Sequence, residues 1–212
     1  MKIIHLSYYL TQSTPIYGGK KDTILFENIK SISNGDTTND SRFEFPAHVG
    51  THIDFPKHFS NSGKSSSDYN ASFWVFNNIG FLNCTVNKIE ERILELNTNI
   101  EILLIKTNFG KKRNKPEYWS RQPVIPSKLA SILKKRFPNL RVLGFDLISL
   151  TSQLDKIEGK KAHIEFLLKN EILILEDMDL NNLEKTPTML FIAPLQIDNV
   201  DGVPCNVIAF LN

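Results

Sequence analysis

Residues 48–58 read HVGTHIDFPKH, and this is the most informative stretch of the 212-residue chain. The sequence has five histidines, and three of them lie in this stretch beside Asp54. A neutral imidazole binds a metal ion through a ring nitrogen, and a carboxylate binds one ion or bridges two. A lone histidine would be ordinary in a core or on a surface, whereas three of them in phase with an aspartate indicate a hydrolytic metal site.

The residue types in this stretch favour a strand. Gly50 and three β-branched residues disfavour a helix, and Pro56 would break one. On a strand His48, His52 and Asp54 point to one face. A straight strand separates the two histidines by ~13 Å, which is too far for both to bind one ion at ~2.1 Å each. We therefore expect a bend at Gly50, because glycine tolerates bulge dihedrals and leaves room for a metal.

His58 lies beyond the proline and off the predicted strand. We expect it near the metal without needing to bind it, a suitable position for a general acid or base near pH 7. A dinuclear site needs two or three further ligands. Of the remaining histidines, His5 lies in a short apolar strand and is expected to be structural. For His163, at the start of a predicted helix, the residue type leaves the role open.

Two carboxylates each follow an apolar strand, Asp146 and Glu176. A buried carboxylate must be paired or bound to a cation, because its desolvation is costly. The alternative is that each strand ends there and the side chain faces solvent. Both residues therefore stay open as candidate ligands at this point.

Composition excludes several classes of protein. Hydrophobic residues make up 41% and charged residues 23%, as in soluble globular proteins. A net charge of +2 gives no reason to expect nucleic acid or an anionic membrane as partner. We find neither a signal peptide nor a membrane span, and predict a cytoplasmic protein. Cys84 and Cys205 form no CxxC pair and are predicted to be small buried side chains.

Strand signals outnumber helix signals along the chain. Continuously apolar runs, such as 102–105 and 172–175, are typical of strands covered on both faces. We predict one mixed α/β domain over residues 1–212 with polar loops at 31–41 and 60–70. Helices are predicted at 127–137 and 161–169. Strands are predicted at 2–6, 23–26, 44–54, 81–87, 100–107, 141–147, 171–176, 189–194 and 207–211.

These residues resemble the metal-dependent cyclase family, which includes bacterial kynurenine formamidase and isatin hydrolase. The stretch 48–58 is similar to the family signature HxGTHxDxPxH. Weaker similarities follow in the family's order: Ser7 with PIYGG at 15–19, LLIKTN at 103–108, GFDLIS at 144–149, and AH at 162–163 with ILEDM at 174–178.

The resemblance implies a compact α/β domain with a central mixed, β-barrel-like sheet and a few flanking helices, assembled as a homodimer or homotetramer. It also implies two divalent ions, zinc or alternatively manganese. One ion would be held by His48, His52 and Asp54. Asp54 would reach the second ion as well, together with His163, and Glu176 would contact both. The implied ligands are His48, His52, Asp54, His163 and Glu176.

The implied reaction is hydrolysis of a small amide, an aryl formamide or a cyclic amide, by water activated between the ions. His58 would accept the proton of the water and pass it to the leaving nitrogen. Two alternatives stay open. The same site serves lactone hydrolysis or dehydration, or the protein binds a small molecule without catalysis, and the presence of His58 argues against the second.

Tyr17 stands where the family has a tryptophan beside the substrate, so we expect it to contact a small, aromatic and anionic substrate. The basic stretch 111–121 leaves three interpretations open. It is a solvated loop, a nucleic-acid contact, or a rim of the active site lined by Tyr118 or Trp119.

Overall fold

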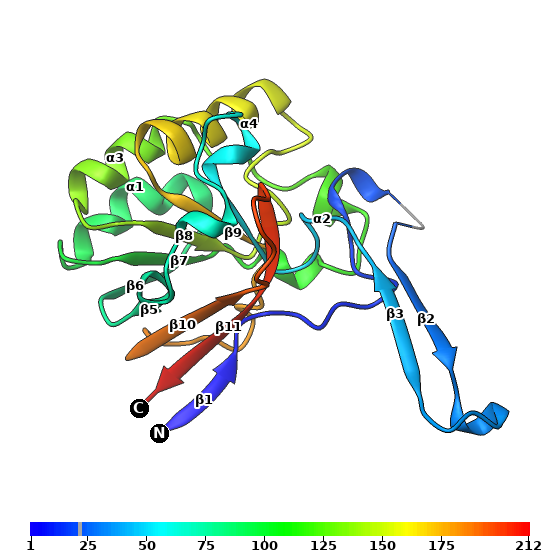
Figure 1. The fold of residues 1–212 in the computed structure, drawn as a ribbon. Helices are drawn as coiled ribbons and strands as arrows, with labels where there is room; N and C mark the ends of the chain where they lie inside the picture. Colours follow the sequence, from blue (N-terminus) through cyan, green and yellow to red (C-terminus); the bar gives the residue numbers. More distant parts are fainter. Residues whose placement is uncertain (21–22) are drawn as a thin grey trace.

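Buried strands form the centre of the structure, a computed structural model that describes residues 1–20 and 23–212 (Figure 1). The main sheet has the strand order β5-β10-β11-β4-β9-β8-β7-β6, and β1 pairs with β11. Its strands are β1 (Lys2–His5), β4 (His52–Asp54), β5 (Val75–Phe76), β6 (Ile79–Asn83), β7 (Ile102–Lys106), β8 (Val142–Phe145), β9 (Leu173–Glu176), β10 (Met189–Pro194) and β11 (Gly202–Leu211).

This sheet is mixed and curls almost into a barrel. Strands β6 to β9 run parallel to one another, and the remaining pairs are antiparallel. Strands β5 and β6 stand at opposite ends of the strand order, yet only residues 77 and 78 separate them in sequence. The two ends of the sheet therefore lie near each other. The predicted fold class, α/β with a central β-barrel-like sheet, is confirmed.

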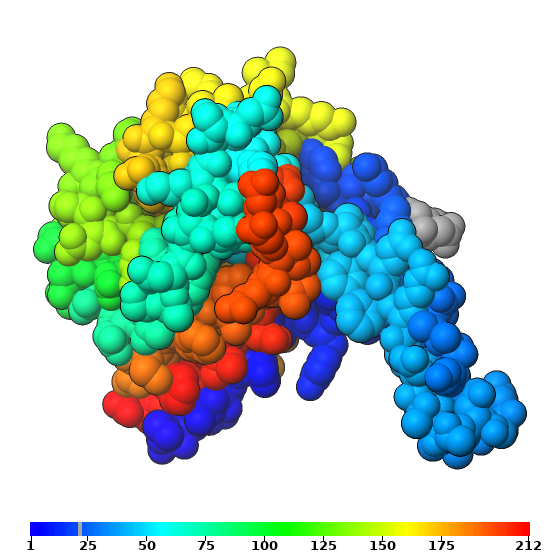
Figure 2. Space-filling model, in the orientation of Figure 1, coloured from blue at the N-terminus to red at the C-terminus, as the bar shows by residue number. Residues whose placement is uncertain are grey.

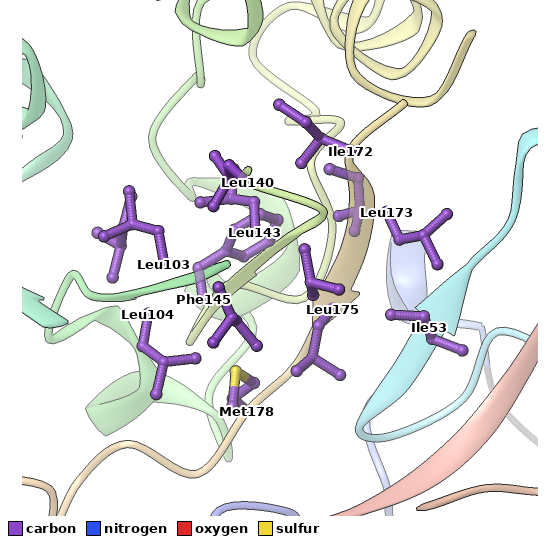
Figure 3. Packing of buried hydrophobic residues seen from close by; sticks show 14 of the residues in the cluster. Ile53, Leu103, Leu104, Leu140, Leu143, Phe145, Ile172, Leu173, Leu175 and Met178 are labelled. Atoms are coloured by element: carbon purple, nitrogen blue, oxygen red, sulfur yellow. The ribbon is translucent and has the colours of Figure 1, made fainter. Parts of the chain in front are cut away.

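The parallel strands β7, β8 and β9 are buried along their whole length, as their continuous apolar runs predict. Figure 3 shows Leu103, Leu143 and Leu175 among the packed side chains that these strands contribute. Fully burying one such side chain stabilises the fold by roughly 1.5–3 kcal/mol. The helices beside these strands, drawn in green and yellow in Figure 1, are α1 (Ile89–Arg92), α3 (Leu129–Arg136) and α4 (Lys156–His163).

Helix α4 begins earlier than predicted. The Asp155 side chain caps it by accepting a hydrogen bond from the Glu158 N–H (2.9 Å). His163 therefore ends the helix and does not open it, and a π-helical turn, Ile164–Lys169, follows.

Within the described residues, no helix is both long and apolar enough to cross a membrane. Both cysteines are free; Cys205 is buried as predicted, whereas Cys84 is half-exposed.

Strands β2 (Leu25–Lys30) and β3 (Asp40–Glu44) form a separate two-stranded antiparallel sheet. This hairpin, the arm, projects from the body of the molecule (Figures 1 and 2). The prediction of one bent strand over 44–54 is wrong, because β3 ends at Glu44 and β4 begins only at His52. Pro46 has no N–H to donate to a sheet, and the chain turns before it enters β4.

The turn contains Gly50, at the predicted place. Its backbone is left-handed, with φ +60°, a conformation that favours glycine. The predicted reason is partly wrong, however. A Cβ on Gly50 would lie 2.5 Å from Cδ2 of Leu10, so the missing side chain makes room for Leu10 and not for a metal.

We expect Gly50→Ala to destabilise the fold by roughly 1–3 kcal/mol more than Gly35→Ala. Both glycines have positive φ, but a Cβ on Gly35, at the arm's tip, meets nothing within 4 Å. The control therefore carries the backbone strain without the collision with Leu10. Urea unfolding of both variants measures the difference, and equal losses would show that the collision relaxes freely.

Candidate metal centre

Strand pairing brings the predicted ligands together inside the sheet. His52 on β4 lies directly opposite Glu176 on β9. Asp54, two residues along β4, shares the face of His52 because strand side chains alternate. His163 reaches the same place from the end of α4. All four side chains are buried, with exposures of 1–3%, so the charged groups must be paired or bound.

Each carboxylate presents its two oxygens to two different imidazoles. His52 Nε2 lies 3.4 Å from Asp54 Oδ1 and 3.4 Å from Glu176 Oε2. His163 Nε2 lies 3.4 Å from Asp54 Oδ2 and 3.6 Å from Glu176 Oε1. Asp54 and Glu176 therefore stand between the two histidines as bridging carboxylates would.

These spacings fit a bound cation better than direct hydrogen bonds, which are commonest near ~2.9 Å. Two ligands at ~2.1 Å from one ion in tetrahedral geometry lie about 3.4 Å apart. In addition, Asp54 Oδ2 is buried and has no hydrogen-bond partner among the described residues. An orphaned buried oxygen is costly unless something binds it. The residues at this centre therefore fit a divalent metal ion.

The outer ring nitrogens of both buried histidines are held by backbone carbonyls. His52 Nδ1 lies 2.8 Å from the Gly50 carbonyl, and His163 Nδ1 lies 2.9 Å from the Gly159 carbonyl. A carbonyl only accepts, so each Nδ1 carries the hydrogen and donates it. In the neutral ring each Nε2 then carries no hydrogen and faces the carboxylates, which is the arrangement of a metal-ligating histidine.

His48 and His58 complete the cluster from outside β4. His48 Nδ1 lies 2.8 Å from Asp54 Oδ1, although its backbone precedes the Gly50 turn. His58 ends a 3-10 turn, Pro56–His58, and its ring centroid lies 4.1 Å from that of His48. A ring nitrogen of each, with an oxygen of Asp54, falls within 4.8 Å of the others. His58 therefore lies beside the ligand atoms of His48 and Asp54.

Burial and charge compete in this cluster. Burial lowers the pKa of His163, but Asp54 and Glu176 raise it to about 10. Burial also lowers the pKa of His48, and the hydrogen bonds to Asp201 and Asp54 raise it to about 9. For both buried carboxylates, burial raises the pKa, yet the neighbouring histidines hold it below its usual value. Without an ion, protonated imidazoles balance the carboxylates, and a bound cation would replace those protons.

Sequence reasoning missed two residues of the site, Asp201 and Gly202. Asp201 Oδ2 accepts hydrogen bonds from His48 Nε2 (2.9 Å) and His58 Nδ1 (2.9 Å). A Cβ on Gly202 would collide with the ring of His48. The only signal in the sequence was an Asp-Gly pair before the last strand, which reads as an ordinary turn. Asp201 is 143 residues from His58, so no local spacing connects them.

Other predicted candidates lie outside the cluster. His5 is exposed on β1. Asp146 accepts hydrogen bonds from the N–H and hydroxyl of Thr107 (2.7 and 2.6 Å), so it is a structural carboxylate.

The stretch 111–121 is exposed along most of its length, as a solvated loop would be, but two of its side chains are bound to the body of the protein. Arg113 binds Asp177 through two nitrogens, and the buried hydroxyl of Tyr118 donates to Asp177 Oδ1 (2.6 Å). Tyr118 therefore does not line a pocket rim. Because Asp177 follows Glu176 directly, these bonds anchor the end of β9 that carries the predicted ligand.

Tyr17 lies at the mouth of the cluster. A pocket of ≈760 Å³ runs from His48 to the base of the arm. The hydroxyl of Tyr17 is buried without a hydrogen-bond partner among the described residues. Burial and then the charge of Glu176 raise the pKa of this hydroxyl, so it stays protonated. The pocket is lined by Ile16, Tyr17, Lys20, Thr23, Leu25, Glu44, Phe45, Pro46 and His48.

Known proteins resemble this chain over most of its length. A family model described as "Putative cyclase" matches residues 4–152. A kynurenine formamidase of Bacillus anthracis is 28% identical over 190 residues, which cover 86% of this chain and 85% of the relative. Isatin hydrolase A from Labrenzia aggregata, solved with benzyl benzoate bound, is 19% identical with a TM-score of 0.81, covering 98% of this chain and 93% of that one. A structure described as a potential metal-dependent hydrolase with cyclase activity is 20% identical with a TM-score of 0.74, covering 98% and 96%.

Proposed function

The chain belongs to the cyclase family, and from that premise we propose that it is a metal-dependent hydrolase of a small amide. The observation that carries the proposal is the pair of buried carboxylates, Asp54 and Glu176, each placed between two imidazoles at ligand spacing. The kynurenine formamidases that align with this chain support the amide as the bond cut.

Two divalent ions suit this arrangement. Asp54 Oδ1 faces His48 and His52, whereas Asp54 Oδ2 and Glu176 Oε1 face His163. We assign one ion to each side, with Asp54 shared. Imidazole and carboxylate ligands suit zinc, and the carboxylate share also suits manganese. When bound, such ions polarise a carbonyl and acidify a water.

The chain's own residues supply proton transfer and substrate placement. Asp201 holds His58 through Nδ1, which leaves Nε2 available. His58 would take the proton from the attacking water and deliver it to the leaving nitrogen, which departs as a neutral amine. The buried walls around His52 and Glu176 keep bulk water from the reacting groups.

The pocket beside Tyr17 favours an aromatic, anionic substrate. The ring of Tyr17 offers a face for stacking, and Lys20 on the pocket wall offers a positive charge to a carboxylate. Glu44 lines the same pocket, so the anionic group would sit on the Lys20 side. An aryl formamide such as N-formylkynurenine meets this description. A cyclic amide such as isatin offers the aromatic ring and gains its carboxylate when the ring amide is hydrolysed.

Hydrolysis assays on metal-loaded protein test the proposal. Protein loaded with zinc or manganese should cleave N-formylkynurenine or isatin, a chelator should stop turnover, and re-addition of the ion should restore it. A panel of substrates that includes lactones distinguishes amide hydrolysis from lactone hydrolysis. Metal-loaded protein that binds these molecules but turns over none of them would make it a binding protein instead.

Loss of the Tyr17 hydroxyl should weaken catalysis without harming the fold. Because this hydroxyl is buried and has no partner among the described residues, we expect it to donate to the bound substrate. One such bond contributes about 1 kcal/mol, so Tyr17→Phe should lower kcat/KM roughly fivefold. Tyr9→Phe is the control, since Tyr9 is 91% exposed. An unchanged kcat/KM in Tyr17→Phe would leave only the ring as a contact.

We also propose that the protein is a homodimer or homotetramer, with the arm in the interface. Ile29, Ile32 and Phe43 on the arm are each more than half exposed. An isolated two-stranded hairpin is marginally stable in water, so cover from a second chain would stabilise it. Light scattering on protein eluted from a size-exclusion column measures the molar mass and so tests the assembly. A monomer at micromolar concentration would contradict it, and Phe43→Ser should shift an oligomer toward monomer.

A further inference from the structure

A single carboxylate oxygen joins the two histidines to which the proposed function gives different tasks. Asp201 Oδ2 lies 2.9 Å from Nε2 of His48 and 2.9 Å from Nδ1 of His58. An ionised carboxylate only accepts, so both ring nitrogens carry hydrogens and donate them. The remaining nitrogen of His48 faces Asp54, and the remaining nitrogen of His58 makes no hydrogen bond within the described part of the chain.

The backbone holds Asp201 in place independently of the histidines. Its carbonyl accepts a hydrogen bond from the Phe55 N–H (2.9 Å), at the end of β4. Gly202, the next residue, pairs with Asp54 across the β4–β11 ladder. The His48 ring occupies the space in which a Gly202 side chain would lie. Asp201 and Gly202 together therefore fix the position of the His48 ring at the start of β11, the strand that pairs with β4.

We propose that Asp201 is a positioning residue that orients His48 and His58 together. By accepting from Nε2 of His48, it directs Nδ1 of that ring to Asp54 and the metal side. By accepting from Nδ1 of His58, it leaves Nε2 without a hydrogen and open to the reacting water. This second task rests on the proposed function, and the first rests on the metal centre alone.

The effect of removing the carboxylate follows from what Asp201 touches. It contacts both histidines but does not line the pocket beside Tyr17. Asp201→Ala should therefore lower kcat and leave KM within about threefold. Loss of the partner of a metal ligand typically costs 10–100-fold in metal affinity or activity, and we expect a loss in that range. The Asp201 side chain is 41% exposed, so the fold should survive the change.

A double-mutant cycle separates positioning from a general structural role. If Asp201 acts on turnover through His58, Asp201→Ala should change kcat by less than about threefold in a His58→Ala background. Asp198→Asn is the matched control, because Asp198 lies in the same loop and its carboxylate accepts from Ser67. Equal losses from Asp201→Ala in both backgrounds, measured at saturating metal, would overturn the positioning of His58.

Two readouts do not depend on turnover. Competition titration with a chelator should show weaker zinc binding in Asp201→Ala, and Asp201→Asn, a closer match in shape, should show the same direction. Nitrogen-15 NMR of the histidine rings should show His58 held with hydrogen on Nδ1 in the wild type and mixed tautomers in Asp201→Ala. Unchanged zinc affinity and unchanged ring spectra would overturn the proposal. If no amide or lactone is cleaved by the wild type, the proposed function fails while these two readouts still decide on Asp201.

Discussion

His58→Ala should keep its metal ions and lose about 10²–10⁴-fold in kcat, the range that a positioned general acid or base contributes. The ring is held through Nδ1 by Asp201, and its other nitrogen makes no hydrogen bond among the described residues. No second imidazole can take over, because His48, His52 and His163 are engaged with carboxylates. Elemental analysis and steady-state kinetics on the same preparation give both quantities.

The metal content of this variant decides between two roles. A ring nitrogen of His58 lies within 4.8 Å of the ligand atoms of His48 and Asp54, close enough for a ligand after a small movement. Loss of one ion in His58→Ala would therefore make His58 a ligand and not a proton carrier. His5→Ala provides the control, since His5 is exposed on β1, and it should match the wild type in metal and in kcat.

Asp54→Asn should bind neither ion tightly and should have no measurable turnover above background. One oxygen of Asp54 faces His48 and His52, and the other faces His163. An amide replaces one of these oxygens with an NH₂ group, which carries hydrogens and does not ligate a metal. It also removes the negative charge that balances the cations or the protonated imidazoles. Metal analysis after dialysis, with activity on the same sample, measures the effect.

Asp146→Asn is a stringent control for Asp54→Asn. The two aspartates are almost equally buried, at 2% and 1% exposure, but Asp146 bonds to Thr107 and Gly110 and takes no part in the cluster. Asp146→Asn should therefore lower the melting temperature and keep both ions. If Asp54→Asn kept two ions at wild-type affinity, the assignment of Asp54 as a shared ligand would be wrong.

Local patterns predicted the strands of the core well. Apolar runs such as 102–105 and 172–175 can be satisfied only by burial on both faces, so β7 and β9 appear where expected. The prediction failed where the chain turns. Residues 44–54 have strand-forming side chains, but Pro46 and the left-handed Gly50 divide them between the arm and β4.

Part of the metal centre could also be predicted from local sequence patterns. His52 and Asp54 share a face through strand alternation alone, and strand period depends only on the backbone. His163 and Glu176 were open candidates on residue type and were assigned through the family resemblance. The structure brings both to Asp54 or His52 at 3.4 Å, through pairing of β4 with β9 and the end of α4.

The sequence by itself determined the residue types of the site. Histidine and carboxylate side chains spaced two residues apart on a strand share one face, and together they indicate a metal site. Only the tertiary structure decided how residues 48–58 are divided and supported. The side chain of His48 contacts Asp54 from the other side of the Gly50 turn. One carboxylate oxygen of Asp201, which lies 143 residues after His58, accepts hydrogen bonds from the rings of both His48 and His58. Such contacts depend on how strands pair across the sheet, and pairing between distant segments leaves no periodic trace in either segment.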